Sequence, residues 1–289
     1  MVSRRVILPF FIVVFGAIIL GIFLLDLSHW RNYFNQIDTT RFSQTLLPGS
    51  QRLSPIDGMI QVYIPAGEFT LGESGGSNNP RHKVYLDAFW IDLTEVTNEM
   101  YARCVQEGKC DYTVRQAITE LRYHDPAYAN DPVVYVTWDS ALEYCQWAGR
   151  RLPTEAEWEK AARGTDLRKY PWGNSPPDPS LLNYDNNVGE TTAVGSYLEG
   201  ASPYGVLDMA GNVREWVADW FNGSYYLLSP LKNPSGPNNG EKRVLRGGSY
   251  IDDAQKVQVT TRFSHIPSSA GMNRGFRCAV SSWLVSTPE

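Results

Sequence analysis

The sequence predicts a mixed α/β domain with little regular secondary structure, preceded by one membrane-spanning helix. Short segments of alternating apolar and polar residues indicate strands, and three stretches of helical periodicity follow threonine caps. Proline, glycine and asparagine are spread through residues 171–240, which indicates ordered loops. One uncharged run near the N-terminus is long enough to cross a bilayer.

The composition favours a folded, non-nucleic-acid-binding protein. The chain has 289 residues, of which 43% are hydrophobic and 20% charged, as expected for a domain with a real core. That length allows one large domain or two small ones. The net charge is −5 and no run of lysine or arginine forms a basic stripe, so we expect no nucleic-acid partner.

The N-terminus predicts a single-pass membrane protein. Residues 6–25 (VILPFFIVVFGAIILGIFLL) carry no charge, and Arg4 and Arg5 precede them. Positive charge on this side predicts a cytoplasmic tip at residues 1–5, a transmembrane anchor at 6–25 and a C-terminal body outside the cytoplasm. The alternative is a cleaved signal peptide, but its apolar core usually has about 7–15 residues and a small-residue cleavage site. Both alternatives export the body.

The four cysteines agree with an oxidising compartment. Their even number suits disulfide formation, and spacing alone leaves all three pairings open. No C-x-x-C spacing occurs, so metal binding by this set is disfavoured. The cysteines are Cys104, Cys110, Cys145 and Cys278.

The chain after the anchor divides into a stalk and a domain. Residues 26–58 are polar and mixed, and they include prolines and a glycine, which is typical of a linker. Residues 59–289 carry the strand and helix patterns. The predicted strands are Ile60–Ile64, residues 84–91, Arg243–Arg246 and residues 276–280.

Three helices begin at threonine caps. Thr97 precedes a helix that ends near Gly108, and Thr137 precedes one that ends at Gly149. Thr154 and a glutamate three residues later form a capping box, and Gly164 ends that helix.

Seven segments, in this order, resemble the sulfatase-modifying-factor (formylglycine-generating enzyme) family over about residues 59–282. The resemblance implies a C-type-lectin-like fold of the formylglycine-generating-enzyme type. It also implies that Cys145 pairs with Cys278. Cys104 and Cys110 are then left. A turn at Gly108 can bring them together in a second disulfide bond, and the alternative is that both are free thiols. The segments are IPAGEFTLG (64–72), EVTN (95–98), YCQWAGRRLPTEAEWE (144–159), YPWGN (170–174), GNVREW (211–216), RGGSY (246–250) and GFRC (275–278).

The family's enzyme oxidises a client cysteine to formylglycine with oxygen and a copper ion held by two cysteines. Cu(I) is soft and prefers thiolates. The two matching positions here are Asp252 and Val257, and a tryptophan of the oxygen pocket is replaced by Arg214. Ser249 matches the serine of that pocket. We therefore expect no copper site and no copper-dependent oxidation.

Calcium is the metal that the resemblance favours. The family's calcium loop corresponds to Asp208, Gly211, Val213 and Glu215, which offer the hard carboxylate and carbonyl oxygens that calcium prefers. The alternative is that both carboxylates bond loop amides. A second family site begins at positions that match Asn183 and Tyr184, although the following loop is shorter here.

Other metal chemistry has little support in the sequence. Some family members hold non-heme iron through histidines. This chain has only His29, His82, His124 and His265, and no two of them lie at helical spacing.

Two functions follow from these residues. The first is a non-catalytic domain that binds a protein or peptide in a groove near Asp252 and Arg214, with tyrosines of an insertion as candidate anchors. The second is an oxidoreductase, of the formylglycine-generating or non-heme iron type, acting on a protein cysteine or a small molecule. Those tyrosines are Tyr112, Tyr123 and Tyr128.

Overall fold

The computed structural model describes residues 46–112 and 125–282. The predicted tip, the anchor at 6–25 and the first part of the stalk lie outside these ranges. Within the described ranges, no helix combines the length and apolar character that crossing a membrane requires.

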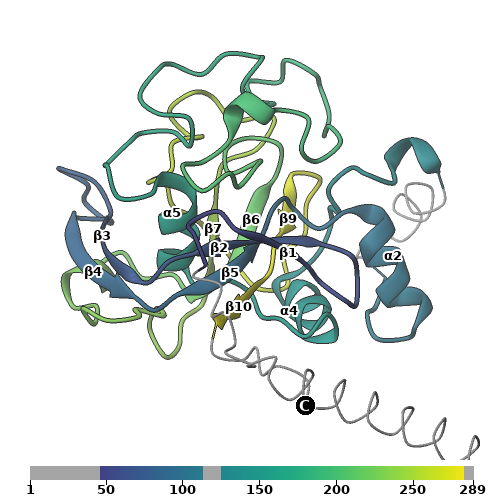
Figure 1. The fold of residues 1–289 in the computed structure, drawn as a ribbon, viewed down its shortest axis with the longest axis horizontal. Coiled ribbons are helices and arrows are strands. Elements are labelled where there is room, and N and C mark those ends of the chain that lie inside the picture. Colours follow the sequence, from purple (N-terminus) through teal and green to yellow (C-terminus); the bar gives the residue numbers. More distant parts are fainter. Residues whose placement is uncertain (1–45, 113–124, 283–289) are drawn as a thin grey trace, which may run out of the picture. The chain divides into compact units, whose positions relative to one another are not determined.

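Within the described residues, short strands form three sheets, and three α-helices lie beside them (Figure 1). One four-stranded sheet has the antiparallel order β1-β2-β5-β10, and β3 pairs with β4 in a two-stranded sheet. The third sheet has the order β8-β7-β6-β9, in which β6 and β9 are parallel. The strands are β1 (Gln51–Leu53), β2 (Ile60–Ile64), β3 (Gly67–Leu71), β4 (His82–Leu86), β5 (Phe89–Asp92), β6 (Arg214–Trp220), β7 (Arg243–Arg246), β8 (Phe263–His265), β9 (Arg274–Phe276) and β10 (Ala279–Ser281).

Two predicted strands, β2 and β7, are confirmed, and two others are wrong as single strands. Residues 84–91 span parts of β4 and β5, which belong to different sheets because the chain crosses between them at Asp87 and Ala88. Residues 276–280 likewise divide into the end of β9, which pairs with β6, and β10, which pairs with β5. Neither break contains a proline or glycine, so the sequence pattern did not mark it.

The domain begins earlier than the predicted stalk boundary. Gln51–Leu53 forms β1 and pairs with β2, although these residues fall in the segment 26–58 that we assigned to a stalk. Asp57 is also buried, where it contacts Arg150 and accepts a hydrogen bond from Tyr144 Oη at 2.8 Å. Residues before Met59 therefore contribute to the core.

All three predicted helices are confirmed with their caps. Thr97 Oγ1 accepts from Met100 N, and Thr137 Oγ1 accepts from Ser140 N. The capping box is complete, since Thr154 Oγ1 accepts from Glu157 N while the Glu157 carboxylate accepts from Thr154 N. The helices are α2 (Asn98–Gln106), α4 (Trp138–Trp147) and α5 (Glu155–Arg163).

Both expected disulfides are present. Cys145 on α4 bonds Cys278, which lies between β9 and β10, and so ties a helix to the last strands. Cys104 on α2 bonds Cys110, six residues later. Both bonds lie in one apolar cluster with Tyr144.

The loop-rich region between α5 and β7 contains one strand that the sequence analysis missed. This strand, β6, lies between β7 and β9 and has a mostly buried run at its centre, so it lacks the alternation typical of a half-exposed strand. Figure 1 shows the remaining loops of this region, in teal and green, both above the sheets and beside β4, where Lys232 forms a bridge with Tyr85. Aromatic rings hold them: Trp172 stacks on Tyr170 with 5.1 Å between ring centroids.

Candidate functional site

An ion pair occupies the position where the family resemblance places a copper-binding cysteine. Arg214, the first residue of β6, donates from Nε and Nη2 to the two carboxylate oxygens of Asp252, at 2.8 and 2.6 Å. Ser249 donates from its backbone N and its Oγ to Asp252 Oδ2, at 2.9 and 2.7 Å. Asn273 Nδ2 in turn donates to Ser249 Oγ at 3.2 Å. The sequence analysis named Arg214, Ser249 and Asp252, and the structure brings them together.

Sequence reasoning missed the aromatic and cationic surroundings of this pair. The Arg214 guanidinium lies 4.0 Å from the centroid of the Phe263 ring, in cation–π range. Burial first, and then the nearby charges of Arg274, Lys242 and Arg214, lower the pKa of His265 below its usual value. The surface around Arg214 is therefore electropositive.

The second copper-ligand position, in contrast, is apolar and closed. Val257 is buried in a small cluster with Tyr170, Leu182 and Ala210. Gly248 packs so tightly against it that an added Cβ would come within 2.8 Å of Val257 Cγ1. All four cysteines of the chain are in disulfides, so no thiolate is available to a soft metal.

The residues of the predicted calcium loop form a buried acidic group. Glu215 Oε2 accepts from Trp158 Nε1 at 2.9 Å and from Arg277 Nε at 2.7 Å, and Glu215 Oε1 accepts from Arg277 Nη2 at 2.8 Å. Asp208 Oδ2 accepts from Gly195 N at 2.6 Å. Both carboxylates thus have protein partners, but only Asp208 bonds a backbone amide, which the alternative to calcium supposed for both.

This acidic group also contains more carboxyl groups than cations. Glu95, Asp208 and Glu215 are buried around one guanidinium, Arg277. Burial, followed by repulsion from Asp208 and Glu215, raises the pKa of Glu95, and burial raises that of Asp208. Sequence reasoning missed the roles of Glu95 and Arg277, although both lie in segments that carry the family resemblance.

The donors fit a calcium ion in chemistry. Each carboxylate oxygen has two acceptor positions, so Glu215 Oε1 keeps one beside its bond to Arg277. Asn183, the first residue of the second predicted site, is buried, and its Oδ1 has no hydrogen-bond partner among the described residues. Tyr184 instead donates from its hydroxyl to Pro177 O at 3.1 Å. In residues 46–112 and 125–282, no three His, Cys, Asp or Glu side chains form a metal-binding group, so backbone carbonyls would have to complete any calcium shell.

The histidines in the described ranges show structural contacts. His82 bonds Pro80 O at 3.0 Å and Ser229 Oγ at 2.8 Å, and its ring lies edge-on to Tyr226. His29 and His124 fall outside the described residues. Of the candidate tyrosine anchors, Tyr112 is exposed, Tyr128 is half-buried and Tyr123 also falls outside.

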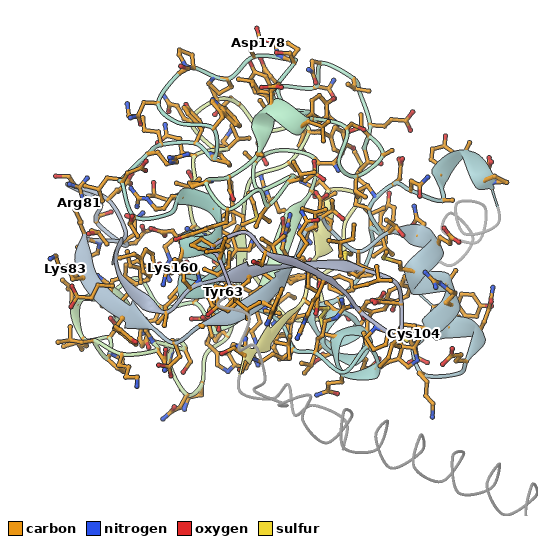
Figure 2. The ribbon with its side chains drawn as sticks, viewed as in Figure 1. Tyr63, Arg81, Lys83, Cys104, Lys160 and Asp178 are labelled. Carbon is orange, nitrogen blue, oxygen red and sulfur yellow. A yellow bond between two sulfur atoms is a disulfide. The ribbon has the colours of Figure 1, made fainter. Side chains whose placement is uncertain are left out.

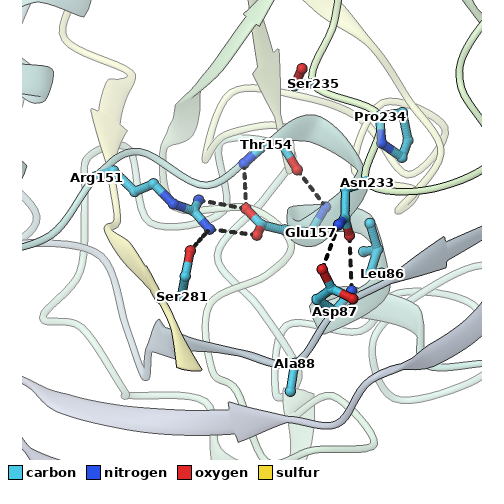
Figure 3. A pocket seen from close by; sticks show the side chains of 10 residues that line it. All are labelled: Leu86, Asp87, Ala88, Arg151, Thr154, Glu157, Asn233, Pro234, Ser235 and Ser281. Carbon is cyan, nitrogen blue, oxygen red and sulfur yellow. Dashed lines mark hydrogen bonds and ion pairs between the residues drawn. The ribbon is translucent and has the colours of Figure 1, made fainter. Parts of the chain in front are cut away.

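A separate hollow of about 220 Å³ lies where the connection between β4 and β5, the end of β10, the start of α5 and the loop at residues 233–235 meet (Figure 3). Its charged groups bond one another. Arg151 donates to both carboxylate oxygens of Glu157, at 2.7 and 2.6 Å, and to Ser281 Oγ at 3.1 Å. Asn233 Nδ2 donates to Asp87 at 2.7 Å. This hollow consequently offers few free polar groups to a ligand.

Comparison with known proteins agrees with the fold and the segments described above. A family model described as the sulfatase-modifying factor enzyme 1-like domain matches residues 44–282. The formylglycine-generating enzyme of Streptomyces coelicolor is 35% identical over 286 residues, covering 78% of this chain and 90% of that protein. The "Inactive C-alpha-formylglycine-generating enzyme 2" of Mus musculus is 31% identical over 279 residues, covering 76% and 85%.

Other relatives share only this domain or only the fold. The serine/threonine-protein kinase pkn1 of Chlamydia caviae is 38% identical over 236 residues, but the match covers only 37% of that protein. The solved structure of PvdO from Pseudomonas aeruginosa superposes with a TM-score of 0.68 at 25% identity, covering 82% of this chain and all of that one. By sequence over most of its length, this chain belongs to the sulfatase-modifying factor enzyme 1-like family.

Proposed function

We propose that this chain is a non-catalytic member of its family that binds a protein or peptide through the surface around Arg214 and Asp252. The observation that carries the proposal is the bidentate ion pair between these two residues. The first copper-ligand position thus holds the carboxylate of Asp252, a hard ligand that is already paired with Arg214. The second position holds the buried side chain of Val257. The mouse relative that is named as inactive, 31% identical to this chain, supports such a role.

The exposed part of the ion pair supports a binding role. The Arg214 side chain is 20% exposed, whereas Asp252 is 4% exposed. The guanidinium therefore presents a rigid, positively charged and aromatic-backed edge to solvent, and arginine beside an aromatic ring is a frequent binding hot spot. An acidic or polar peptide suits this surface.

We also propose that the domain works outside the cytoplasm, anchored by residues 6–25. The support is the uncharged apolar run after two arginines, together with two disulfides in the folded body. Calcium is part of the proposal as a structural ion at Asp208, Gly211, Val213 and Glu215, with a second ion at Asn183 and Tyr184. The excess of buried carboxylates near Arg277 supports the first site.

The alternative function is an oxidoreductase of the formylglycine-generating or non-heme iron type. The purified full-length chain is incubated with a C-x-P-x-R peptide, oxygen and copper, and the peptide is examined for the mass of the aldehyde. The Streptomyces coelicolor relative serves as the positive control. We expect no aldehyde from this chain; conversion above a no-enzyme blank would refute the non-catalytic proposal.

A further inference from the structure

A second cavity, of about 250 Å³, lies apart from the Arg214–Asp252 site and shares no residue with it. The connection between β3 and β4, the end of α5 with the loop that follows, and the loop before β8 form its wall. Four of its lining residues are cations: Arg81, Arg163, Arg168 and Lys169. Glu73 is the one carboxylate in that lining. In a chain of net charge −5, this is a strongly cationic wall.

Two of the four cations have acidic partners, but one of these partners is shared. Arg168 donates from Nε and Nη2 to the two oxygens of Asp166, at 2.8 and 2.6 Å. Arg163 Nη1 donates to Glu159 Oε1 at 2.9 Å, while Glu159 Oε2 accepts from Arg246 at 2.6 Å. One carboxylate thus serves two buried guanidinium groups, and Arg163 is only partly neutralised.

The remaining donors have no partner among the described residues. Arg163 is only 2% exposed, yet its Nε makes no hydrogen bond. A buried donor without an acceptor is costly, and an anion in the cavity would supply one. Arg81 and Lys169 are exposed side chains that form no ion pair within residues 46–112 and 125–282. The cavity therefore joins one buried cation with an unsatisfied donor to two exposed cations.

We propose that this cavity binds an oxyanion of the phosphate or sulfate type. Arginine and lysine donors in a concave wall suit such an anion, because charge-assisted hydrogen bonds to it are strong. A volume of 250 Å³ equals roughly eight water molecules at about 30 Å³ each, which leaves room for a small organic group attached to the anion. The carboxylate of Glu73 would repel the anion, but the lining has four cations against this one carboxylate. Glu73 Oε2 also accepts a hydrogen bond from Thr260 Oγ1 at 3.0 Å.

The test compares two variants of the full-length chain by calorimetric titration with inorganic phosphate. Arg81→Gln/Lys169→Gln removes two lining charges that have no structural partner, so the fold should be retained. Lys83→Gln is the matched control, because Lys83 is an exposed cation on β4 two residues from Arg81 but outside the cavity lining (Figure 2). We expect saturable binding by the unmodified chain, about tenfold weaker binding by the double variant, and less than twofold change in the control.

Three further probes identify the source of the anion: inorganic sulfate, glycerol 3-phosphate, and phosphatidylcholine vesicles with or without phosphatidic acid. Tighter binding of glycerol 3-phosphate than of phosphate would assign a soluble ester, and retention on acidic vesicles that free phosphate abolishes would assign a lipid headgroup. The proposal fails if phosphate and sulfate do not bind up to about 10 mM, or if the double variant binds phosphate as tightly as the control does.

Discussion

Arg214 and Asp252 lie in a side-by-side arrangement in which each carboxylate oxygen accepts one guanidinium N–H, at 2.8 and 2.6 Å. The pair joins the first residue of β6 to the loop after β7. Asp252 also accepts two hydrogen bonds from Ser249, so one carboxylate organises the whole loop.

Asp252→Asn should therefore destabilise the domain by about 2–3 kcal/mol, because it leaves a partly buried guanidinium without its charge partner. Urea unfolding followed by tryptophan fluorescence measures the change. The neighbouring Asp253→Asn is the control, since Asp253 is exposed and bonds only the local Lys256 and backbone groups. Equal stability of the two variants would contradict the role assigned to Asp252.

Restoring sulfur at the two lost positions should restore affinity for a soft metal. The Asp252→Cys/Val257→Cys variant is expected to bind one Cu(I) ion per chain under reducing conditions that leave both disulfides intact, whereas the unmodified chain binds none. Competition with a chromogenic Cu(I) chelator measures the stoichiometry. Asp252→Ser/Val257→Ser is the control for altered packing, and copper uptake by the serine variant would show that the metal binds elsewhere.

Calcium should stabilise the domain if it binds at Asp208. At a free concentration about 100 times its dissociation constant, a ligand of the native state adds about 2.7 kcal/mol to the free energy of unfolding. We expect EGTA to lower the melting temperature and Asp208→Asn to reduce that shift. Asp178→Asn is the control, because Asp178 is an exposed loop carboxylate whose side chain accepts hydrogen bonds from Ser180 (Figure 2). An unchanged melting temperature in EGTA, with no calcium found by elemental analysis, would exclude the ion.

Lys160 should make the stability depend on pH above neutrality. Burial lowers its pKa to about 8, and its Nζ donates to Pro65 O at 2.7 Å and Gly67 O at 3.0 Å (Figure 2). In the unfolded chain the amine titrates near its usual 10.5, so between these values the unfolded state binds more protons. Stability then rises with pH across that window, and is lowest below it. A neutral amine can still donate to both carbonyls.

Lys160→Met removes this dependence on pH. Between pH 7.5 and 9.5, the free energy of unfolding should therefore increase more for the unmodified chain than for this variant. Urea titrations at the two pH values give the difference. Lys83→Met should show no such change, because Lys83 is exposed. A parallel response of all three proteins would show that Lys160 is charged in the fold.

The two disulfides should differ in their contribution. The Cys145–Cys278 bond closes a sequence separation of 133 residues and the Cys104–Cys110 bond one of 6. On the chain-entropy model these loops correspond to about 5 and about 2 kcal/mol. Paired alanine substitutions at each bond, compared by urea unfolding, should reproduce that order; a larger loss at Cys104–Cys110 would contradict it.

The sequence predicted those features that depend on residues close together in the chain, such as the helix caps. The caps at Thr97, Thr137 and Thr154 each satisfy helix N–H groups within a few residues, so their positions follow from the sequence alone. Motif order supplied the fold and the Cys145–Cys278 pairing, which spacing left open. It also showed that the copper ligands are missing, because that required only residue identity.

The sequence could not show which sheet a strand joins or which charges meet. Residues 84–91 contain no proline or glycine where the chain passes from one sheet to another, and β6 lies among loops. The partners of Glu215 are distant in sequence, as Trp158 and Arg277 show. Long-range contacts of this kind depend on the assembled topology.

Arg277 has a consequence for when this domain can form during synthesis. Its guanidinium reaches carbonyls at the end of β5 and in the loop at Leu207, and it also holds the carboxylate at the second residue of β6. The strands β9 and β10 on either side of it complete two different sheets. A nascent chain in which residues 274–281 have not yet emerged from the ribosome lacks the segment that joins these parts, so both sheets stay incomplete until that segment is free.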